Sequence, residues 1–399
     1  MEAVVVRSGY VPEPIEVPGA PQWLSALRRN AFLAFEKTGF PTPHDEAWRY
    51  TGLQPITGTA WVNARAPLPT FALPPGVRLR RVAEVREREV EGHLAKIATL
   101  EGRPFSALNA AALEDAYVLE IDPGAVLAEP ITLNWTAPAP GEVTHPRVLV
   151  LAGERSQATV VETYTFVNDG EGRYLRNAVT EIALAEGAMM EHYAVQRESI
   201  SACHVHTIAV RQGRASHFTS HNVALGSALA RVDLDVRLDA EGAECTLNGL
   251  FAGAGTQHLD NRTTIDHAKP HCVSRELYKG VMDGASRGVF FGKIIVRPDA
   301  QKTDAIQTNK NLLLSREALV NSTPALEIFA DDVKCKHGST TGQLDLLALF
   351  YLRSRGIGEA EARTLLTQAF AADVAERLRV PAVREAVTRE LARRLGGGA

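Results

Sequence analysis

The stretch RVDLDVRL at residues 231–238 is the clearest indication of local structure in the centre of this chain. Valine and leucine alternate in it with aspartate and arginine, and a period of two predicts a β-strand with one buried and one solvated face. Similar short runs occur across residues 116–328, where helical patterns are nearly absent; they lie at residues 131–135, 148–151, 159–166, 179–184, 218–223 and 290–296. The central region is therefore predicted to be mainly β.

Turn sequences of a related form separate these runs. They are AEGA at residues 185–188 and 240–243, RQGRA at 211–215, MDGA at 282–285 and RPDA at 297–300. Their irregular spacing, roughly 15 to 40 residues, is typical of the stacked coils of a β-solenoid with loops of variable length. A large β-sandwich also has short strands and frequent turns, so the pattern alone leaves both architectures open.

Helical patterns flank the β region on both sides. After an irregular arm at residues 1–19, a helix is predicted to begin at Pro21 and to end just before Gly39. A Pro-rich connector at residues 59–81 is followed by a second helical pattern at residues 82–115. Beyond Gly342, apolar residues at helical spacing predict three short helices. The predicted domains are an N-terminal helical region, a β core and a C-terminal helical region, at residues 1–115, 116–342 and 343–399.

The composition narrows the class of protein. The chain has 399 residues, a formal net charge of −4 and four cysteines. Its charges are interspersed, which argues against nucleic acid or a membrane as partner, and its cysteines show neither a CxxC pair nor a secreted disulfide framework, which indicates a reducing cytoplasm. The phosphate-binding motifs GxxxxGK[ST] and GxGxxG are missing, which argues against ATP hydrolysis or dinucleotide binding by this chain. The nucleophile motif GxSxG is missing as well.

The segment ADDVKCKHGSTTG at residues 330–342 carries the most suggestive side chains. In an extended conformation Cys335 and His337 share one face, about 7 Å apart at the backbone, with Lys334 and Lys336 on the other. A thiolate and an imidazole so placed could bind one soft metal or sulfur species, and the lysines are expected to raise the thiolate fraction. Spacing alone favours a structural pair, a buried cysteine and a hydrogen-bonded histidine.

Two other groups of residues could bind a metal ion or act as acid–base catalysts. Zinc ligation is formally possible for His204 with His206, or for His267, His271 and Cys272, but no four ligands stand at a familiar spacing. Asp233 and Asp235 resemble the carboxylate pair of a carbohydrate-active enzyme. Because they alternate with arginines, an exposed ladder of ion pairs is the expected arrangement.

Three segments of the chain resemble one protein family. They are QTNKNLLLSREALVNSTPALEIFADDVKCKHGSTTGQLDLLALFYLRSRGI at residues 307–357, FFGKIIVRPDAQKTDA at 290–305 and GFPTPHDEAWRYTGL at 39–53. They are similar to the SufB/SufD family of the SUF iron–sulfur cluster assembly system. The motif ADDVKCKHG and the small number of cysteines favour the SufD branch of this family over the SufB branch, whose members are longer and contain more cysteines.

The resemblance implies a right-handed parallel β-helix between helical ends, acting as a non-catalytic scaffold. It implies pairing through the β-helix with SufB, and binding of the ATPase SufC by the C-terminal helices, where the expected contacts are Leu347, Tyr351, Leu366 and Phe370. Cys335 and His337 match the family's interface residues, where a nascent cluster forms. The expected supporting residues are Asp331, Asp332, Lys334 and Lys336, the last of which is commonly serine in the family.

Further expectations concern ligands and assembly. No metal or cofactor is expected to stay bound, but iron or an Fe–S cluster is expected transiently at an interface in the complex. Alone, the chain is expected to form a homodimer through an exposed sheet edge. A metal-dependent hydrolase using the Cys/His site and a carbohydrate-active β-helix enzyme are the alternative functions.

Overall fold

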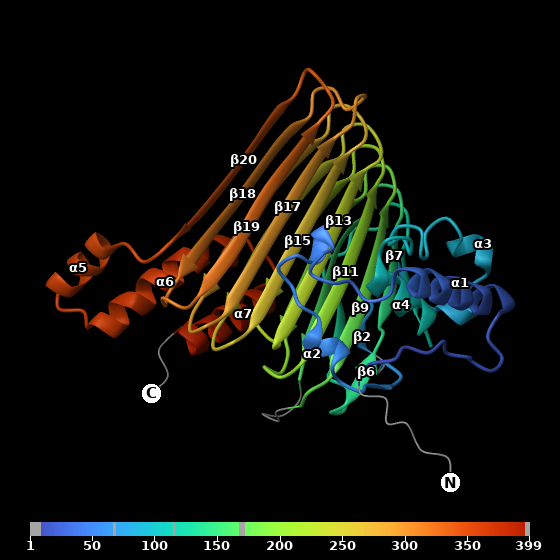
Figure 1. The fold of residues 1–399 in the computed structure, drawn as a ribbon. Helices are drawn as coiled ribbons and strands as arrows, with labels where there is room; N and C mark the ends of the chain where they lie inside the picture. Colours follow the sequence, from blue (N-terminus) through green and yellow to red (C-terminus); the bar gives the residue numbers. More distant parts are fainter. Residues whose placement is uncertain (1–8, 67–68, 115, 167–171, 396–399) are drawn as a thin grey trace, which may run out of the picture.

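The computed structural model describes residues 9–66, 69–114, 116–166 and 172–395. It is mainly β, with a parallel β-solenoid of about eight turns between N-terminal and C-terminal helices (Figure 1). The fold class implied by the resemblance is therefore confirmed, and the β-sandwich alternative is wrong. The first eight residues of the predicted N-terminal arm lie outside the described residues, and the predicted domain boundaries stay predictions.

Two sheets of mostly parallel strands form the solenoid, and each complete coil adds one strand to each sheet. The first sheet contains, in spatial order, β3 (Val77–Arg81), β4 (Tyr117–Ile121), β7 (Arg147–Ala152), β9 (Leu175–Leu184), β11 (Cys203–Gln212), β13 (Leu229–Leu238), β15 (His258–His267), β17 (Arg287–Val296) and β19 (Leu319–Ile328), with β1 (Val62–Asn63) and β6 (Glu142–Thr144) at its margin. The second sheet contains β2 (Thr70–Ala72), β5 (Ile131–Thr136), β8 (Gln157–Thr165), β10 (Met189–Arg197), β12 (His217–Ala224), β14 (Glu244–Gly253), β16 (Val273–Met282), β18 (Asp304–Leu313) and β20 (Lys334–Gly342).

Alternation along the strands builds the core between the two sheets. In β13, Val232, Leu234 and Val236 are buried in the interior, while Asp235 and Arg237 lie on the outer face, as the period of two predicts. The predicted AEGA turns connect coils. Gly187 and Gly242 in them have φ angles of 66° and 71°, a left-handed conformation that glycine adopts without a steric penalty.

The N-terminal region covers the first coils of the solenoid (Figure 1). Its helices are α1 (Gln22–Thr38), α2 (Gln54–Thr57), α3 (Glu87–Val90) and α4 (Pro104–Ala111). The Pro-rich segment predicted as a connector, residues 59–81, contributes three short strands: β1 pairs parallel with β6, whereas β2 and β3 pair antiparallel with β5 and β4. The described prolines of this segment, Pro69, Pro74 and Pro75, lie outside the strands, so they remove no hydrogen bond from the pairing.

Three helices follow the last strand, as predicted. They are α5 (Leu346–Ser354), α6 (Glu359–Ala375) and α7 (Pro381–Leu395). The apolar faces of α6 and α7 pack against outward-facing aliphatic residues of the second sheet; this cluster includes Val195, Val223, Leu250, Val281, Ala371, Val374, Leu378, Val387 and Leu391. In contrast, α5 projects away from the solenoid (Figure 1).

Candidate functional site

The C-terminal end of the solenoid is open. The last strands, β19 and β20, each pair on one side only, with β17 and β18. Figure 1 shows β20 as the outermost strand, far from the N-terminal helices. Within the described chain no element covers this end, so two strands of 10 and 9 residues present free edges to solvent.

The inward row of β20 continues the interior of the solenoid beyond its last covered coil. Cys335 and His337 stand in register with Ala305 and Gln307 of β18, both of which are buried. Because no further coil follows, Cys335 is only half-buried and His337 is exposed. The predicted common face of the two residues is the interior face, and Lys334 and Lys336 do lie on the opposite one.

The thiol of Cys335 corrects one expectation. Burial raises its pKa, the charge of Asp304 raises it further, and a backbone hydrogen bond at Ala305 lowers it. The prediction that Lys334 and Lys336 favour the thiolate is wrong, because their side chains point away from the interior face on which the sulfur lies. In the uncovered chain the surroundings of Cys335 therefore disfavour the thiolate.

A hydrogen-bonded polar layer adjoins these two residues, and sequence reasoning missed it. The hydroxyl oxygens of Ser322 and Ser339 lie 2.7 Å apart, and Ser322 donates to Asn309 Oδ1 over 2.8 Å. Asn311 Nδ2 also donates to Asn309 Oδ1, over 2.6 Å. A polar interior is tolerable where one side of it meets solvent. The repeated asparagines at positions 309 and 311 in an alternating strand were the available signal.

The predicted supporting acids belong to the turn that enters β20. Asp332 forms an ion pair with Lys302, and its backbone amide donates to Gln301 Oε1 over 2.9 Å. Asp331 is exposed. Asp332 therefore ties the last coil to the previous one instead of facing the interior row.

The predicted ATPase contacts separate into two groups. Leu347 and Tyr351 lie on α5 and are 78% and 57% exposed. Two neighbours that were not predicted, Leu346 and Phe350, are equally exposed there at 76% and 71%. The run LLALFY at residues 346–351 was the signal for the whole patch.

The other two predicted contacts, Leu366 and Phe370, lie on α6 and are half-buried. Phe370 packs against the β-helix, and the ammonium nitrogen of Lys279 lies 4.5 Å from its ring centroid. The structure thus places Leu347 and Tyr351 on a free surface, and Phe370 in the contact between α6 and the solenoid.

The histidines considered for zinc are mostly engaged within the fold. His206 Nε2 lies 3.0 Å from Thr180 Oγ1, and His267 Nε2 lies 2.9 Å from Ser274 Oγ. His204 Nδ1 lies 2.7 Å from a carboxylate oxygen of Glu198. Among the residues that the structure describes, no group of three or more His, Cys, Asp or Glu side chains is arranged to hold a metal ion.

The carboxylates considered for carbohydrate chemistry are paired with arginines. Asp233 Oδ1 lies 2.8 Å from Arg231 Nη2, and Asp235 Oδ2 lies 2.6 Å from Arg103 Nη2. The expected exposed ladder is wrong in one respect: Arg103 comes from the segment before α4, which covers this face of the sheet and leaves both acids largely buried. Neither acid is a free partner for general acid–base catalysis.

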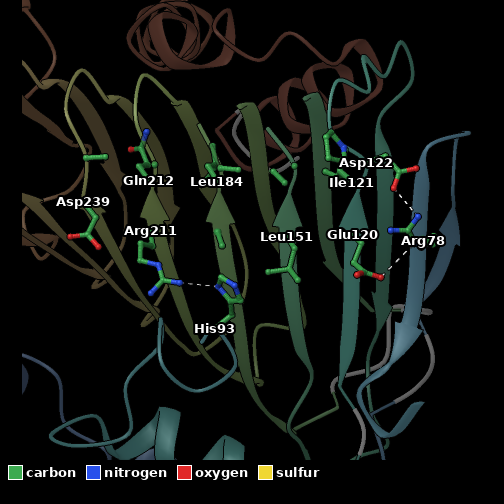
Figure 2. A pocket seen from close by; sticks show the side chains of 17 residues that line it. Arg78, His93, Glu120, Ile121, Asp122, Leu151, Leu184, Arg211, Gln212 and Asp239 are labelled. Carbon is green, nitrogen blue, oxygen red and sulfur yellow. Dashed lines mark hydrogen bonds and ion pairs between the residues drawn. The ribbon is translucent and has the colours of Figure 1, made fainter. Parts of the chain in front are cut away.

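A cleft of about 460 Å³ lies on the outer face of the first sheet (Figure 2). Its charged side chains bind one another: Arg78 lies 2.7 Å from Asp122, and Arg211 Nη2 lies 2.9 Å from His93 Nδ1. It lies beside the N-terminal coils and contains none of the predicted site residues.

No helix in the described ranges has both the length and the apolarity to cross a membrane.

Comparison with known proteins agrees with this architecture. A family model described as SUF system FeS cluster assembly, SufBD core domain, matches residues 135–370. The iron–sulfur cluster assembly protein SufD of Escherichia coli is 31% identical over 96% of this chain and 94% of its own length. A SufBD family protein of Synechocystis is 37% identical over 69% of this chain and 62% of its own length, and one of Mycobacterium tuberculosis is 31% identical over 93% and 94%.

Proposed function

The chain belongs to the SufB/SufD family of iron–sulfur cluster assembly proteins, and on this premise we propose that it is a non-catalytic scaffold subunit. It pairs with SufB through the open end of its β-helix and with the ATPase SufC through its C-terminal helices. The uncovered interior row at Cys335 and His337 is the observation that carries the proposal. The system operates in the cytoplasm.

The open end suits a partner with the same fold. A second solenoid can continue each sheet by pairing with the free edges of β19 and β20, which removes the cost of unpaired edges. Exposed apolar side chains at this end, Leu319, Ile328 and Phe329, gain burial in such a contact. When SufB is absent, a second copy of the chain takes its place and forms a homodimer.

The cargo site is incomplete in one chain. One imidazole and one thiol supply two ligands, whereas an iron–sulfur cluster is usually held by four protein ligands, so the partner contributes the remainder. Docking closes the open interior and brings the cargo, iron or a nascent cluster, between the two chains. His337 is the first ligand because imidazole binds a metal through a nitrogen lone pair, whereas the half-buried Cys335 thiol must first lose its proton.

The C-terminal helices connect ATPase docking to this site. The exposed patch at residues 346–351 of α5 receives SufC. Behind it, α6 is joined to the solenoid: Lys279 Nζ lies 2.8 Å from the Phe370 carbonyl and 2.9 Å from Asp373, and Arg363 donates to the Leu314 carbonyl over 3.1 Å. Leu314 directly follows β18, the strand that pairs with β20. Movement of α6 during ATP turnover is therefore transmitted to the open end.

Anaerobic co-purification with SufB and SufC tests the proposal. The chain is expected to retain both proteins, and His337→Ala is expected to leave the complex intact while lowering cluster formation on it. His271→Ala, an exposed histidine in a turn outside the site, is the matched control and should have no effect. Failure to retain both partners would refute the scaffold role; normal cluster formation by His337→Ala would refute the site.

A further inference from the structure

A column of three polar side chains leads from the interior of the solenoid to His337. Glu276 of β16, Gln307 of β18 and His337 of β20 are in register on successive strands of the second sheet, and all point inward. The preceding member of this column is Leu247 of β14, so the polar column begins at Glu276. Successive members are separated only by the strand spacing, about 4.8 Å.

Glu276 is a buried carboxyl without a charged partner. It is 4% exposed, and in the described chain no lysine, arginine or histidine forms an ion pair with it. Burial raises its pKa to about 7, and hydrogen bonds from Thr263 and Gln307 oppose this rise. Above neutral pH it is therefore an ionised carboxylate that relies on neutral donors.

The amide of Gln307 is held in one orientation by this carboxylate. Its Nε2 donates to Glu276 Oε2 over 2.7 Å, and a carboxylate accepts only from the nitrogen of an amide, so the amide oxygen is left for another donor. The facing position in β17 is Gly292, where a Cβ atom would lie 2.3 Å from Gln307 Nε2. Absence of that side chain leaves room for the amide.

The remaining end of the amide has no partner in the described chain. Gln307 Oε1 is buried and accepts no hydrogen bond there. The next residue in register is His337, whose exposed ring is free to turn toward it. A buried carbonyl oxygen without a donor costs about 1 to 3 kcal/mol, which favours capture of the nearest ring N–H.

We propose that Gln307, held by Glu276, is a positioning residue for His337: its Oε1 accepts one ring N–H of the imidazole and thereby directs the lone pair of the other ring nitrogen out of the open end. Histidines that bind metals usually donate a hydrogen bond from the N–H of their second ring nitrogen in this way. This hydrogen bond selects the tautomer and the ring orientation. The assignment rests on the proposed role of His337 as a ligand for iron or a nascent cluster.

Nitrogen NMR of the full chain with ¹⁵N-labelled histidine tests the assignment at pH 8.5, where Glu276 is ionised. His337→Gln identifies the resonances of His337. The wild-type ring is expected in a single neutral tautomer, whereas Gln307→Met, which keeps the shape and removes the acceptor, is expected to give the mixture of tautomers found in a free imidazole. Gln307→Glu retains an acceptor and should keep the single tautomer.

Asn311→Leu is the matched control, since it removes a buried amide from the same strand two inward positions away. It should leave the His337 resonances unchanged. A tautomer mixture in the wild-type chain, or a single tautomer that persists in Gln307→Met, would overturn the assignment, and the wild-type measurement decides even if the Met variant does not fold. Failure of the proposed function is a separate result, namely normal cluster formation by His337→Ala with the tautomer selection intact.

Discussion

The two ends of the solenoid differ in how they terminate. At the N-terminal end, β2 and β3 reverse direction and pair antiparallel with β5 and β4, and the N-terminal helices lie over the first coils. At the C-terminal end, β19 and β20 stop in the same parallel direction with free edges. A solenoid needs a cap at both ends to remain a monomer. The described chain has no such cap at its C-terminal end, and the proposed pairing with a second solenoid would supply it.

The interiors of the two ends differ in the same sense. Trp135, 1% exposed, and Tyr164 are stacked with centroids 6.5 Å apart at the N-terminal end. At the other end the interior row contains Asn309, Ser339 and His337. Aromatic residues stabilise a layer that is permanently covered, whereas polar residues suit one that alternates between solvent and a partner. The comparison suggests four experiments.

The largest effect is expected from opening the closed end. Trp135→Ala removes a fully buried indole and should lower the free energy of unfolding by about 3 to 5 kcal/mol. Ser339→Ala, in the exposed polar layer, should lower it by less than about 1 kcal/mol. Urea unfolding followed by circular dichroism measures both. Equal losses would show that the C-terminal end is as firmly closed as the N-terminal one.

Interior carboxyls in the two halves are expected to give opposite pH dependences. Burial raises the pKa of Glu276 from 4.5 to about 7, so between these values the unfolded chain loses a proton that the folded chain keeps. The free energy of unfolding then falls as pH rises, by up to about 3 kcal/mol. Glu276→Gln should remove this slope in unfolding measurements from pH 4.5 to 8.

Glu162, in the N-terminal half, is expected to make the free energy of unfolding change with pH in the opposite direction. Burial alone would raise its pKa, but hydrogen bonds from His192 and Thr180 help to lower it to about 2. Its contribution to stability is therefore present above about pH 4.5 and is lost as pH falls toward 2. A pH slope in the same direction for both residues would contradict this account of the interior.

Self-association is expected to depend on the open end only. Ile328→Lys places a charge among the exposed apolar residues of that end, and burial of an unpaired charge in a contact should weaken dimer formation by about 10- to 100-fold. Val126→Lys, at an exposed position near the N-terminal coils, is the control. Sedimentation velocity measures both dissociation constants. A dimer that is unaffected by Ile328→Lys would place the contact elsewhere.

The smallest effect is expected at the thiol of Cys335. Because burial raises its pKa, its alkylation by iodoacetamide at pH 7.5 should be slower than that of a free cysteine. Lys334→Gln and Lys336→Gln, on the opposite face of β20, should change the rate by less than about twofold. A severalfold decrease in either variant would show that the lysines do favour the thiolate.

Predictions from the sequence succeeded where the signal is local. The alternation at residues 231–238 predicted β13 and the residues that face its core, and apolar spacing after Gly342 predicted three helices. They failed where a distant segment decides: Arg103 pairs with Asp235, which had been expected in an exposed ladder. The contact of Phe370 with the solenoid was likewise not foreseen from the sequence. Such contacts join residues more than 90 positions apart and leave no periodic pattern.

By itself the sequence determined the strand alternation, the turns, the helical ends and the common face of Cys335 and His337, because each depends on residues within a few positions of one another. Only the tertiary structure decided that this common face is the interior of the last coil, and that Glu276 and Gln307 stand in line behind His337. The physical reason is that each coil of about 30 residues places its side chains against those of the next, so the surroundings of His337 are set by strands one and two coils away.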